Sequence, residues 1–248
     1  MKFIEFIHND HFQKHYLKYY IQDENLDPFI DFFWETNFDN LWSIYPDGFE
    51  DTLLPNIGYT YFVNLVNPCI ISYNKQSFRI SKEAFLPRSQ KMTCHHVKGN
   101  KVFGIKFIVS PILFEKKIKF IEYQNFIYPL SYLIDQKVLS HIRQSTSFEN
   151  RIKIASNYFT NMIQKNRLQK NPAFISTEII KYCKTQKKFN LPLQFFSDHF
   201  RLSHKTIQRN FATTTGINWD DFGYYDKSHF LKELKKFAGP FFNTIKSM

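Results

Sequence analysis

The stretch that most constrains the fold of this chain is residues 193–211, with the sequence LQFFSDHFRLSHKTIQRNF. At helical spacing, four of its residues fall on one face of a first helix: Leu193, Phe196, Ser197 and Phe200. A break follows at Arg201-Leu202, and Ser203 can cap a second helix that carries Ile207 and Phe211 on its apolar side. Two short helices joined by a tight turn predict a helix-turn-helix.

The opposite face of the second helix carries side chains that suit a nucleic acid: His204, Lys205, Gln208 and Arg209. The N-terminal residues of such a helix enter the major groove of DNA, where a guanidinium can bind guanine and a carboxamide can bind adenine. Gln208 and Arg209 are therefore candidates for base contacts. For Arg209, a contact to phosphate or within the domain is an alternative of equal weight, because most protein–DNA hydrogen bonds go to the backbone.

The spacing of residues 193–211 resembles the first DNA-reading unit of AraC-type bacterial transcription regulators. The pattern of that unit is L-x-x-L-A-x-x-x-G-x-S-x-x-T-L-x-R-x-F. Two departures bear on the turn: Arg201 stands where the family has its turn glycine, and Ser197 replaces the usual alanine. Glycine takes a positive φ most easily, so the turn at Arg201 must form without that freedom.

A second match follows at residues 223–239, with the sequence GYYDKSHFLKELKKFAG. It resembles the family signature G-Y-x-D-x-S-H-F-x-x-x-F-K-K-x-x-G, which closes a second helix-turn-helix. On this resemblance, Asp226 caps a helix whose buried side is formed by Phe230, Leu234 and Phe237. We also expect four outward-facing residues of this stretch to contact DNA: Lys227, Ser228, His229 and Lys232.

The segment between the two matches departs most from the family. A long helix and the first helix of the second unit separate the two reading helices in the family, whereas six residues separate Gly216 from Gly223 here. Six helical residues span about 9 Å, and successive major grooves lie about 34 Å apart. The second unit is therefore predicted to be truncated, with its linker helix and first helix missing. A natural deletion, a damaged gene and an incomplete sequence all remain open.

The net charge of +11 is concentrated in the last third of the chain. Residues 1–164 contain 18 Lys and Arg against 16 Asp and Glu, and residues 165–248 contain 15 against 6, a difference of +9. A basic region attached to a near-neutral one is typical of nucleic-acid-binding proteins. From charge alone, a lysine-rich face that only maintains solubility is the alternative.

Between Trp42 and Ile108 the chain consists of short β-type runs separated by turn residues. The predicted strands cover residues 59–66, 69–73, 78–80, 92–96 and 102–108. Such a series predicts a small sandwich or barrel. Three motifs in this region resemble the uncharacterised β-rich domain that precedes some AraC-type DNA-binding domains: YPDG at 45–48, YFVNL at 61–65 and GIKF at 104–107.

Helices are predicted over residues 130–144, 148–165 and 176–185, with Thr146 and Glu149 forming a capping box for the second of them. Residues 166–172 end in Asn171-Pro172, which is typical of a linker. We therefore predict an α+β chain with two domains. Residues 1–165 form a β-rich sandwich or barrel-like regulatory or dimerisation domain with C-terminal helices, and residues 173–248 form an all-α helix-turn-helix domain.

Residues 94–96 are the one cluster that resembles a metal site. Adjacent residues of a strand point to opposite faces, so Cys94 and His96 can share a face while His95 cannot. A zinc site needs more ligands than these two, so we predict a turn or strand edge and no metal. The sequence contains no phosphate loop, nucleophile elbow or convincing carboxylate pair, and we expect a protein that is not an enzyme and needs no cofactor.

The three cysteines, Cys69, Cys94 and Cys183, are odd in number and far apart, which favours a reducing cytoplasm. The sequence has no run of 18 apolar residues and no signal-peptide pattern, so no membrane partner is expected.

The sequence as a whole predicts a cytoplasmic transcription regulator of AraC type. We expect double-stranded DNA as its partner and a homodimer as its assembly, with an unidentified small-molecule effector as a further candidate partner. Three alternatives are a regulator-derived interaction protein without specific DNA binding, non-specific DNA association by charge, and a cupin-like small-molecule-binding protein or enzyme with a basic tail.

Overall fold

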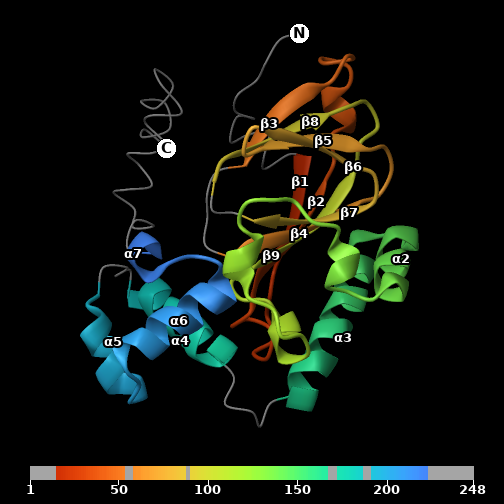
Figure 1. Ribbon diagram of the computed structural model, residues 1–248. Coiled ribbons are helices and arrows are strands. Elements are labelled where there is room, and N and C mark those ends of the chain that lie inside the picture. Colours follow the sequence, from red (N-terminus) through yellow and green to blue (C-terminus); the bar gives the residue numbers. More distant parts are fainter. Residues whose placement is uncertain (1–14, 54–57, 88–89, 167–171, 187–190, 223–248) are drawn as a thin grey trace.

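The computed structural model describes residues 15–53, 58–87, 90–166, 172–186 and 191–222 (Figure 1). The fold is α+β, as predicted: a β-rich part comes first and a helical part follows. Two antiparallel sheets make up the β-rich part. The five-stranded sheet has the order β1-β2-β9-β4-β7, and the four-stranded sheet has the order β3-β8-β5-β6. Their strands are β1 (Tyr16–Tyr20), β2 (Ile30–Thr36), β3 (Phe49–Leu53), β4 (Tyr59–Asn64), β5 (Cys69–Tyr73), β6 (Gln76–Ile80), β7 (Glu83–Pro87), β8 (Met92–His96) and β9 (Val102–Phe107).

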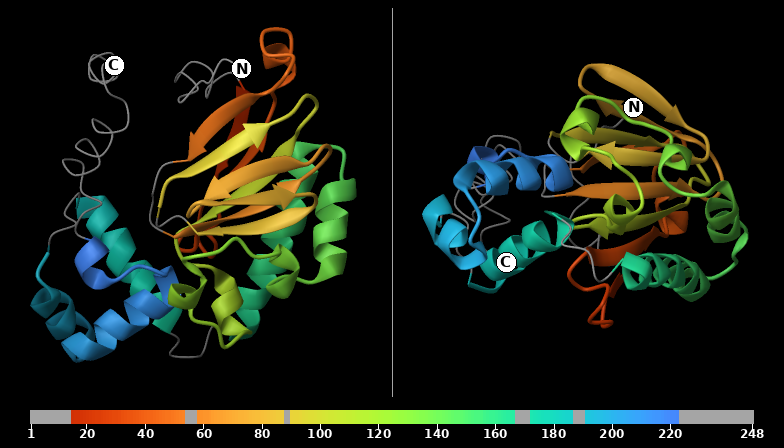
Figure 2. Two further views of the ribbon diagram at one scale, coloured as in Figure 1. Left: turned by 45° about the horizontal axis from the view of Figure 1, so that its top comes forward. Right: turned by 60° about the horizontal axis from the view of Figure 1, so that its bottom comes forward.

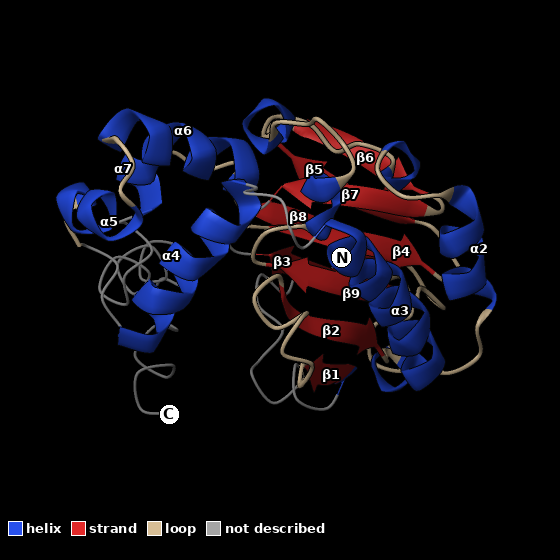
Figure 3. Ribbon diagram, turned by 90° about the horizontal axis from the view of Figure 1, so that it is seen from below, coloured by secondary structure: helices blue, strands red, loops and turns tan. Residues whose placement is uncertain are grey.

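Strand β4 shows why the sheets pack as they do. All six of its residues are buried, and successive side chains of a strand point to opposite faces. Phe62 packs into the core between the two sheets, whereas Tyr59 and Tyr61 pack into the larger core on the other face. Helices cover that second face, with α3 lying across the five-stranded sheet (Figure 3). Strand β4 therefore lies at the centre of a three-layer arrangement.

The three β-region motifs each meet a local structural requirement. In YPDG, Gly48 has a φ of +102° and lies against the carbonyl oxygen of His96. In GIKF, Gly104 lies directly under the indole of Trp34, where a Cβ would clash. In YFVNL, the amide of Asn64 donates to the carbonyl of Ile80 at 3.1 Å and so joins the end of β4 in one sheet to the end of β6 in the other. Local packing and hydrogen bonding therefore account for the residue type at each of these three positions.

Helices α2 (Gln136–Gln144) and α3 (Phe148–Asn166) follow the sandwich. The predicted single helix over 130–144 was wrong: a short 3-10 helix at Leu130–Tyr132 comes first, and Asp135 then caps α2 by accepting from the Lys137 N–H at 2.7 Å. The predicted cap of α3 was also displaced by one residue. Ser147, not Thr146, accepts the N–H of Asn150 at 3.2 Å.

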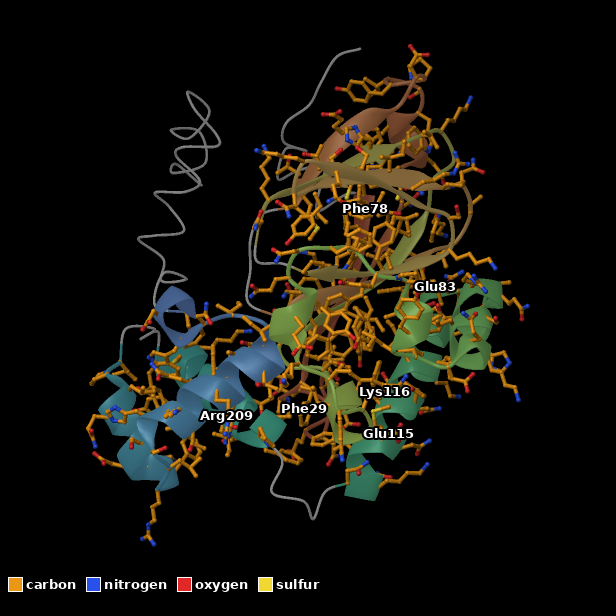
Figure 4. The ribbon with its side chains drawn as sticks, viewed as in Figure 1. Phe29, Phe78, Glu83, Glu115, Lys116 and Arg209 are labelled. Atoms are coloured by element: carbon orange, nitrogen blue, oxygen red, sulfur yellow. The ribbon has the colours of Figure 1, made fainter. Side chains whose placement is uncertain are left out.

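Ion pairs attach α2 and α3 to the sheet. Glu35 on β2 is buried and contacts Arg151 of α3 at 2.8 Å and Lys101 at 2.9 Å. Arg143 of α2 contacts Glu83 of β7 at 3.0 Å (Glu83 is labelled in Figure 4). Removing one partner of a buried pair leaves an uncompensated charge, so these contacts hold the helices in one register on the sheet.

The helical part comprises α4 (Pro172–Gln186), α5 (Leu193–Phe200), α6 (His204–Thr215) and the short α7 (Trp219–Phe222). In Figure 2 these helices lie at the opposite end of the sheets from α2 and α3. The predicted boundary between the two domains falls at residues 166–172, most of which lie outside the described residues. One continuous apolar core nevertheless includes residues from both parts.

Candidate nucleic-acid interface

Helices α5 and α6 form the predicted helix-turn-helix, and the turn between them shows how the missing glycine is replaced. Arg201 takes the left-handed conformation, with φ 53° and ψ 44°, which costs an L-residue about 1–2 kcal/mol. The Leu202 N–H donates to the carbonyl of Ser197 at 3.1 Å, and the Ser197 hydroxyl donates to the carbonyl of Leu202 at 2.6 Å. The hydroxyl of Ser197 thus adds a hydrogen bond across the turn in which Arg201 is strained.

The apolar side of the unit agrees with the predicted pattern in part. Phe196, Ile207 and Phe211 are buried, whereas three other residues of the expected face are only half-buried: Leu193, Ser197 and Phe200. The segment after Gly216 folds back over this core. Phe211 contacts the rings of Trp219 at 5.3 Å and Phe222 at 4.7 Å between centroids. The short helix α7 therefore covers the apolar core of the helix-turn-helix formed by α5 and α6.

The predicted reading residues lie at the N-terminal end of α6. Ser203 caps the helix as predicted, because its hydroxyl accepts the N–H of Thr206 at 3.2 Å. The four reading candidates of this unit are all exposed: His204, Lys205, Gln208 and Arg209 (Arg209 is labelled in Figure 4). At 100° per residue they span an arc of about 140° on one side of the helix. The structure therefore brings these four together on one accessible surface.

The four residues differ in how they are held. His204 Nε2 lies 2.8 Å from Oε1 of Gln194 on α5, and the Gln194 amide in turn donates to Asp198 at 2.6 Å. Within the described part of the chain, Lys205, Gln208 and Arg209 make no hydrogen bond or ion pair. His204 is thus part of the joint between the two helices, and the other three are available to a ligand.

The second predicted set of reading residues lies outside the described residues. These are Lys227, Ser228, His229 and Lys232, and their role in DNA binding remains a prediction. The same holds for the helix expected around Phe230, Leu234 and Phe237.

Sequence reasoning did not identify the C-terminal end of α6 as a contact site. The hydroxyl of Tyr59 on β4 donates to the carbonyl of Thr214, and the Thr214 hydroxyl donates to Ser176 of α4 at 2.7 Å. Thr214, Thr215 and Ile217 are buried. A tyrosine hydroxyl and a backbone carbonyl 155 positions apart carry no sequence signal that would pair them.

Residues 94–96 lie in β8, between β3 and β5, so the expectation of a strand edge or turn was wrong. Cys94 and His96 are buried on one face, as the alternation predicted. His95 faces the other way and contacts Glu50 at 2.6 Å and Ser72 at 2.8 Å. Burial lowers the pKa of His96, and the nearby Asp51 opposes this shift. Among the described residues, no group of three or more His, Cys, Asp or Glu side chains is placed to hold a metal.

No family model and no curated protein matches the sequence. Solved structures with some likeness include unsaturated fatty acid-bound wild-type ToxT from Vibrio cholerae strain SCE256, at 13% identity and a TM-score of 0.39, over 79% of this chain and 81% of that one. ToxT from Vibrio cholerae O395 gives 11% identity and a TM-score of 0.39, over 79% and 83%. The AraC-like transcriptional activator CuxR gives 7% and 0.29, over 97% and 94%. At these values, function has to be argued from the residues of this chain.

A search of the described residues finds no helix with the length and apolar character needed to cross a bilayer. The three cysteines are free thiols, and all are buried.

Proposed function

We propose that this chain is a cytoplasmic transcription regulator of AraC type that reads double-stranded DNA through α6. The observation that carries the proposal is the local geometry of α5, the turn and α6. A capped helix presents Lys205, Gln208 and Arg209 to solvent while its opposite side, with Ile207 and Phe211, is buried. A major groove about 12 Å wide admits one such helix.

The charge distribution supports the same assignment. The last third of the chain carries a difference of +9, and a protein that neutralises phosphates with Lys and Arg binds more weakly as salt rises, with a slope of about −0.9 per phosphate. The proposal assigns Gln208 and Arg209 to base edges and Lys205 to the backbone. His204 is assigned to the helix joint and the groove entrance, because it already contacts Gln194.

A homodimer completes the proposal. One reading helix in the described residues accounts for one half-site, and a second half-site about 34 Å away requires a second protomer. Residues 1–165 are the part proposed to join the two protomers and to bind an effector. The cleft beside Tyr59, Phe120 and Gly216 has a cavity volume of about 10 Å³, far below the roughly 300–1,000 Å³ of drug-sized ligand pockets. An effector of that size must therefore use another part of the domain.

The test is selection of bound duplexes from a randomised library by the full chain, followed by affinity measurements on the selected sequence and a scrambled one. A regulator should recover a defined motif and bind it at least 10³-fold more tightly than the scrambled duplex at physiological salt. Equal, salt-sensitive affinity for both duplexes would reduce the assignment to association by charge. No binding at low salt would favour a regulator-derived interaction protein, which the short segment between Gly216 and Gly223 also permits.

A further inference from the structure

Side-chain packing, and not only the covalent connection of the chain, joins the helical part to the sandwich. Phe174 of α4 packs against Phe29 and Phe114, with ring centroids 5.5 Å and 4.9 Å apart (Phe29 is labelled in Figure 4). At the rim, Lys184 contacts Asp31 at 3.1 Å. Exposed ion pairs of this kind contribute little, so the apolar contact dominates the attachment of α4.

The attachment of α6 is polar and directional. Tyr61 and Ser110 share a hydrogen bond of 2.7 Å, and the Ser110 N–H donates to the Tyr59 hydroxyl at 3.3 Å. The Tyr59 hydroxyl then donates to the Thr214 carbonyl in the last turn of α6. A chain of buried hydrogen bonds thus runs from the helix-covered face of the five-stranded sheet to the end of α6. A hydrogen bond fixes direction as well as distance, which an apolar contact does not.

Packing around this bond restricts the end of α6 further. The ring of Tyr59 stacks on Phe120 with centroids 4.0 Å apart. Gly216, which ends α6 with a φ of +73°, lies so close to Phe120 that a Cβ would sit 3.2 Å from the Phe120 carbonyl oxygen. The Thr214 hydroxyl is held on the other side by Ser176. The end of α6 is therefore fixed from the sandwich and from α4 at once.

A small rotation of α6 about its buried C-terminal end displaces its exposed N-terminal end by a larger distance. The ten residues from Lys205 to Thr214 span about 14 Å, because nine rises of about 1.5 Å separate the first from the last. A tilt of about 10° at the buried end would move the exposed end by about 2 Å, which is several times the roughly 0.5 Å range of a good hydrogen bond. Small changes at the buried end therefore decide whether Gln208 and Arg209 meet a base edge.

We propose that Tyr59 is a positioning residue for DNA reading: through the Thr214 carbonyl, its hydroxyl sets the direction of α6, and this contact persists when DNA is bound. The inference rests on the proposed function of α6. It requires no opening of the molecule, because the reading residues are already exposed while the other end of the helix is docked. Because Tyr59 itself is buried, the proposal gives it no direct contact with DNA.

Tyr59→Phe in the full chain tests the proposal, with Tyr61→Phe as the matched control. Both variants remove one buried hydroxyl from the same strand and one bond to Ser110, but only the first removes the bond to α6. Using the duplex selected by the wild-type protein, we expect Tyr59→Phe to lower the ratio of specific to scrambled affinity by roughly tenfold, as loss of a good base contact does. Tyr61→Phe should leave that ratio within about twofold. A merely structural role would reduce both affinities equally and leave the ratio unchanged.

Hydrogen exchange of the full chain without DNA separates this inference from the proposed function. The Gly216 N–H, which donates to Ala212 at 3.0 Å, should exchange faster in Tyr59→Phe than in Tyr61→Phe, while amides of α5 should not differ. Ser176→Ala, which removes the other bond to Thr214, should have the same effect to a smaller degree. Equal exchange in the two tyrosine variants would overturn the positioning role, as would faster exchange at residues 212–217 of the wild-type protein when the selected duplex binds. Failure of all duplexes to bind would contradict the proposed function alone.

Discussion

The two ends of α6 are built for different purposes. Its first turns carry Lys205, Gln208 and Arg209 in solvent, and within the described part of the chain these side chains have no polar partner. Its last turn is buried, with Thr214 bonded to both Tyr59 and Ser176. The exposed end is suited to an external ligand, and the buried end belongs to the core of the β-rich part. This contrast shows how a short helix can be rigid in direction and still accessible.

The largest loss of stability should come from substitution of Phe211, which lies in α6 between its exposed and its buried end. Phe211 is fully buried between Trp219 and Phe222, so Phe211→Ala should lower the free energy of unfolding by about 3–5 kcal/mol. Urea unfolding followed by circular dichroism measures this. Phe195→Ala is the control, because Phe195 is 39% exposed on the neighbouring helix and should cost much less. Equal losses in both variants would show that the apolar side of the unit is misassigned.

The exposed end should respond in recognition rather than in stability. Gln208→Ala should lower discrimination between the selected duplex and its single-base variants by about 1–3 kcal/mol if the carboxamide contacts a base. Competition binding at fixed salt measures the difference, and the unfolding free energy should not change. Equal weakening on every duplex would place Gln208 on the phosphate backbone instead.

Acid unfolding should test whether the buried end of α6 unfolds together with the sandwich. Burial lowers the pKa of His96, so the unfolded chain binds more protons than the folded one below the ordinary value of about 6.5. Stability should therefore fall with decreasing pH below about 6.5, by up to about 1.4 kcal/mol per pH unit, until the folded His96 also titrates.

Because the apolar core is continuous, hydrogen-exchange protection of the α6 amides and the β-sheet signal should be lost in one transition at each pH. His96→Gln should lack this component of the pH dependence, whereas His204→Gln, at the exposed end of α6, should retain it. Two separate transitions would indicate that α6 is not part of the sandwich core.

The smallest loss of stability should come from changes in the turn between α5 and α6. Ser197→Ala removes the hydrogen bond to Leu202 and should cost about 0.5–1.5 kcal/mol of stability. Adding Arg201→Gly should recover part of this loss, because glycine relieves the left-handed strain. A double-mutant cycle measures the coupling. Strictly additive effects would show that the two departures from the family pattern are independent.

The exposed end of α6 could be predicted from sequence and the buried end could not. Residue type and spacing place Ser203 as a cap and Gln208 and Arg209 outside, because these features act within one helix. The same local rules identified β4, β5 and β9. Strand β3 was missed because Asp51 occupies an inward position, where it is buried and accepts a hydrogen bond from Tyr16 at 2.8 Å.

Two further features that the sequence did not reveal are strand β1 and the contact of Thr214 with Tyr59. Strand β1 has four of its five residues exposed, so it lacks the alternation that marks a half-buried strand. Docking of Thr214 on Tyr59 depends on two elements that meet only in the folded chain. Contacts between a side chain and a distant backbone group leave no periodic trace in a sequence, which is why the positioning of α6 emerged from the structure alone.

The most direct test of the account is a hydroxyl-radical footprint of the full chain on a duplex that contains a single selected half-site. If α6 is the reading helix of each protomer, protection should be confined to one major-groove segment of about half a helical turn. A duplex with two half-sites should then show two such segments, about 34 Å apart. Protection of two successive major grooves by one protomer on the single half-site, or uniform protection along the duplex, would contradict the account.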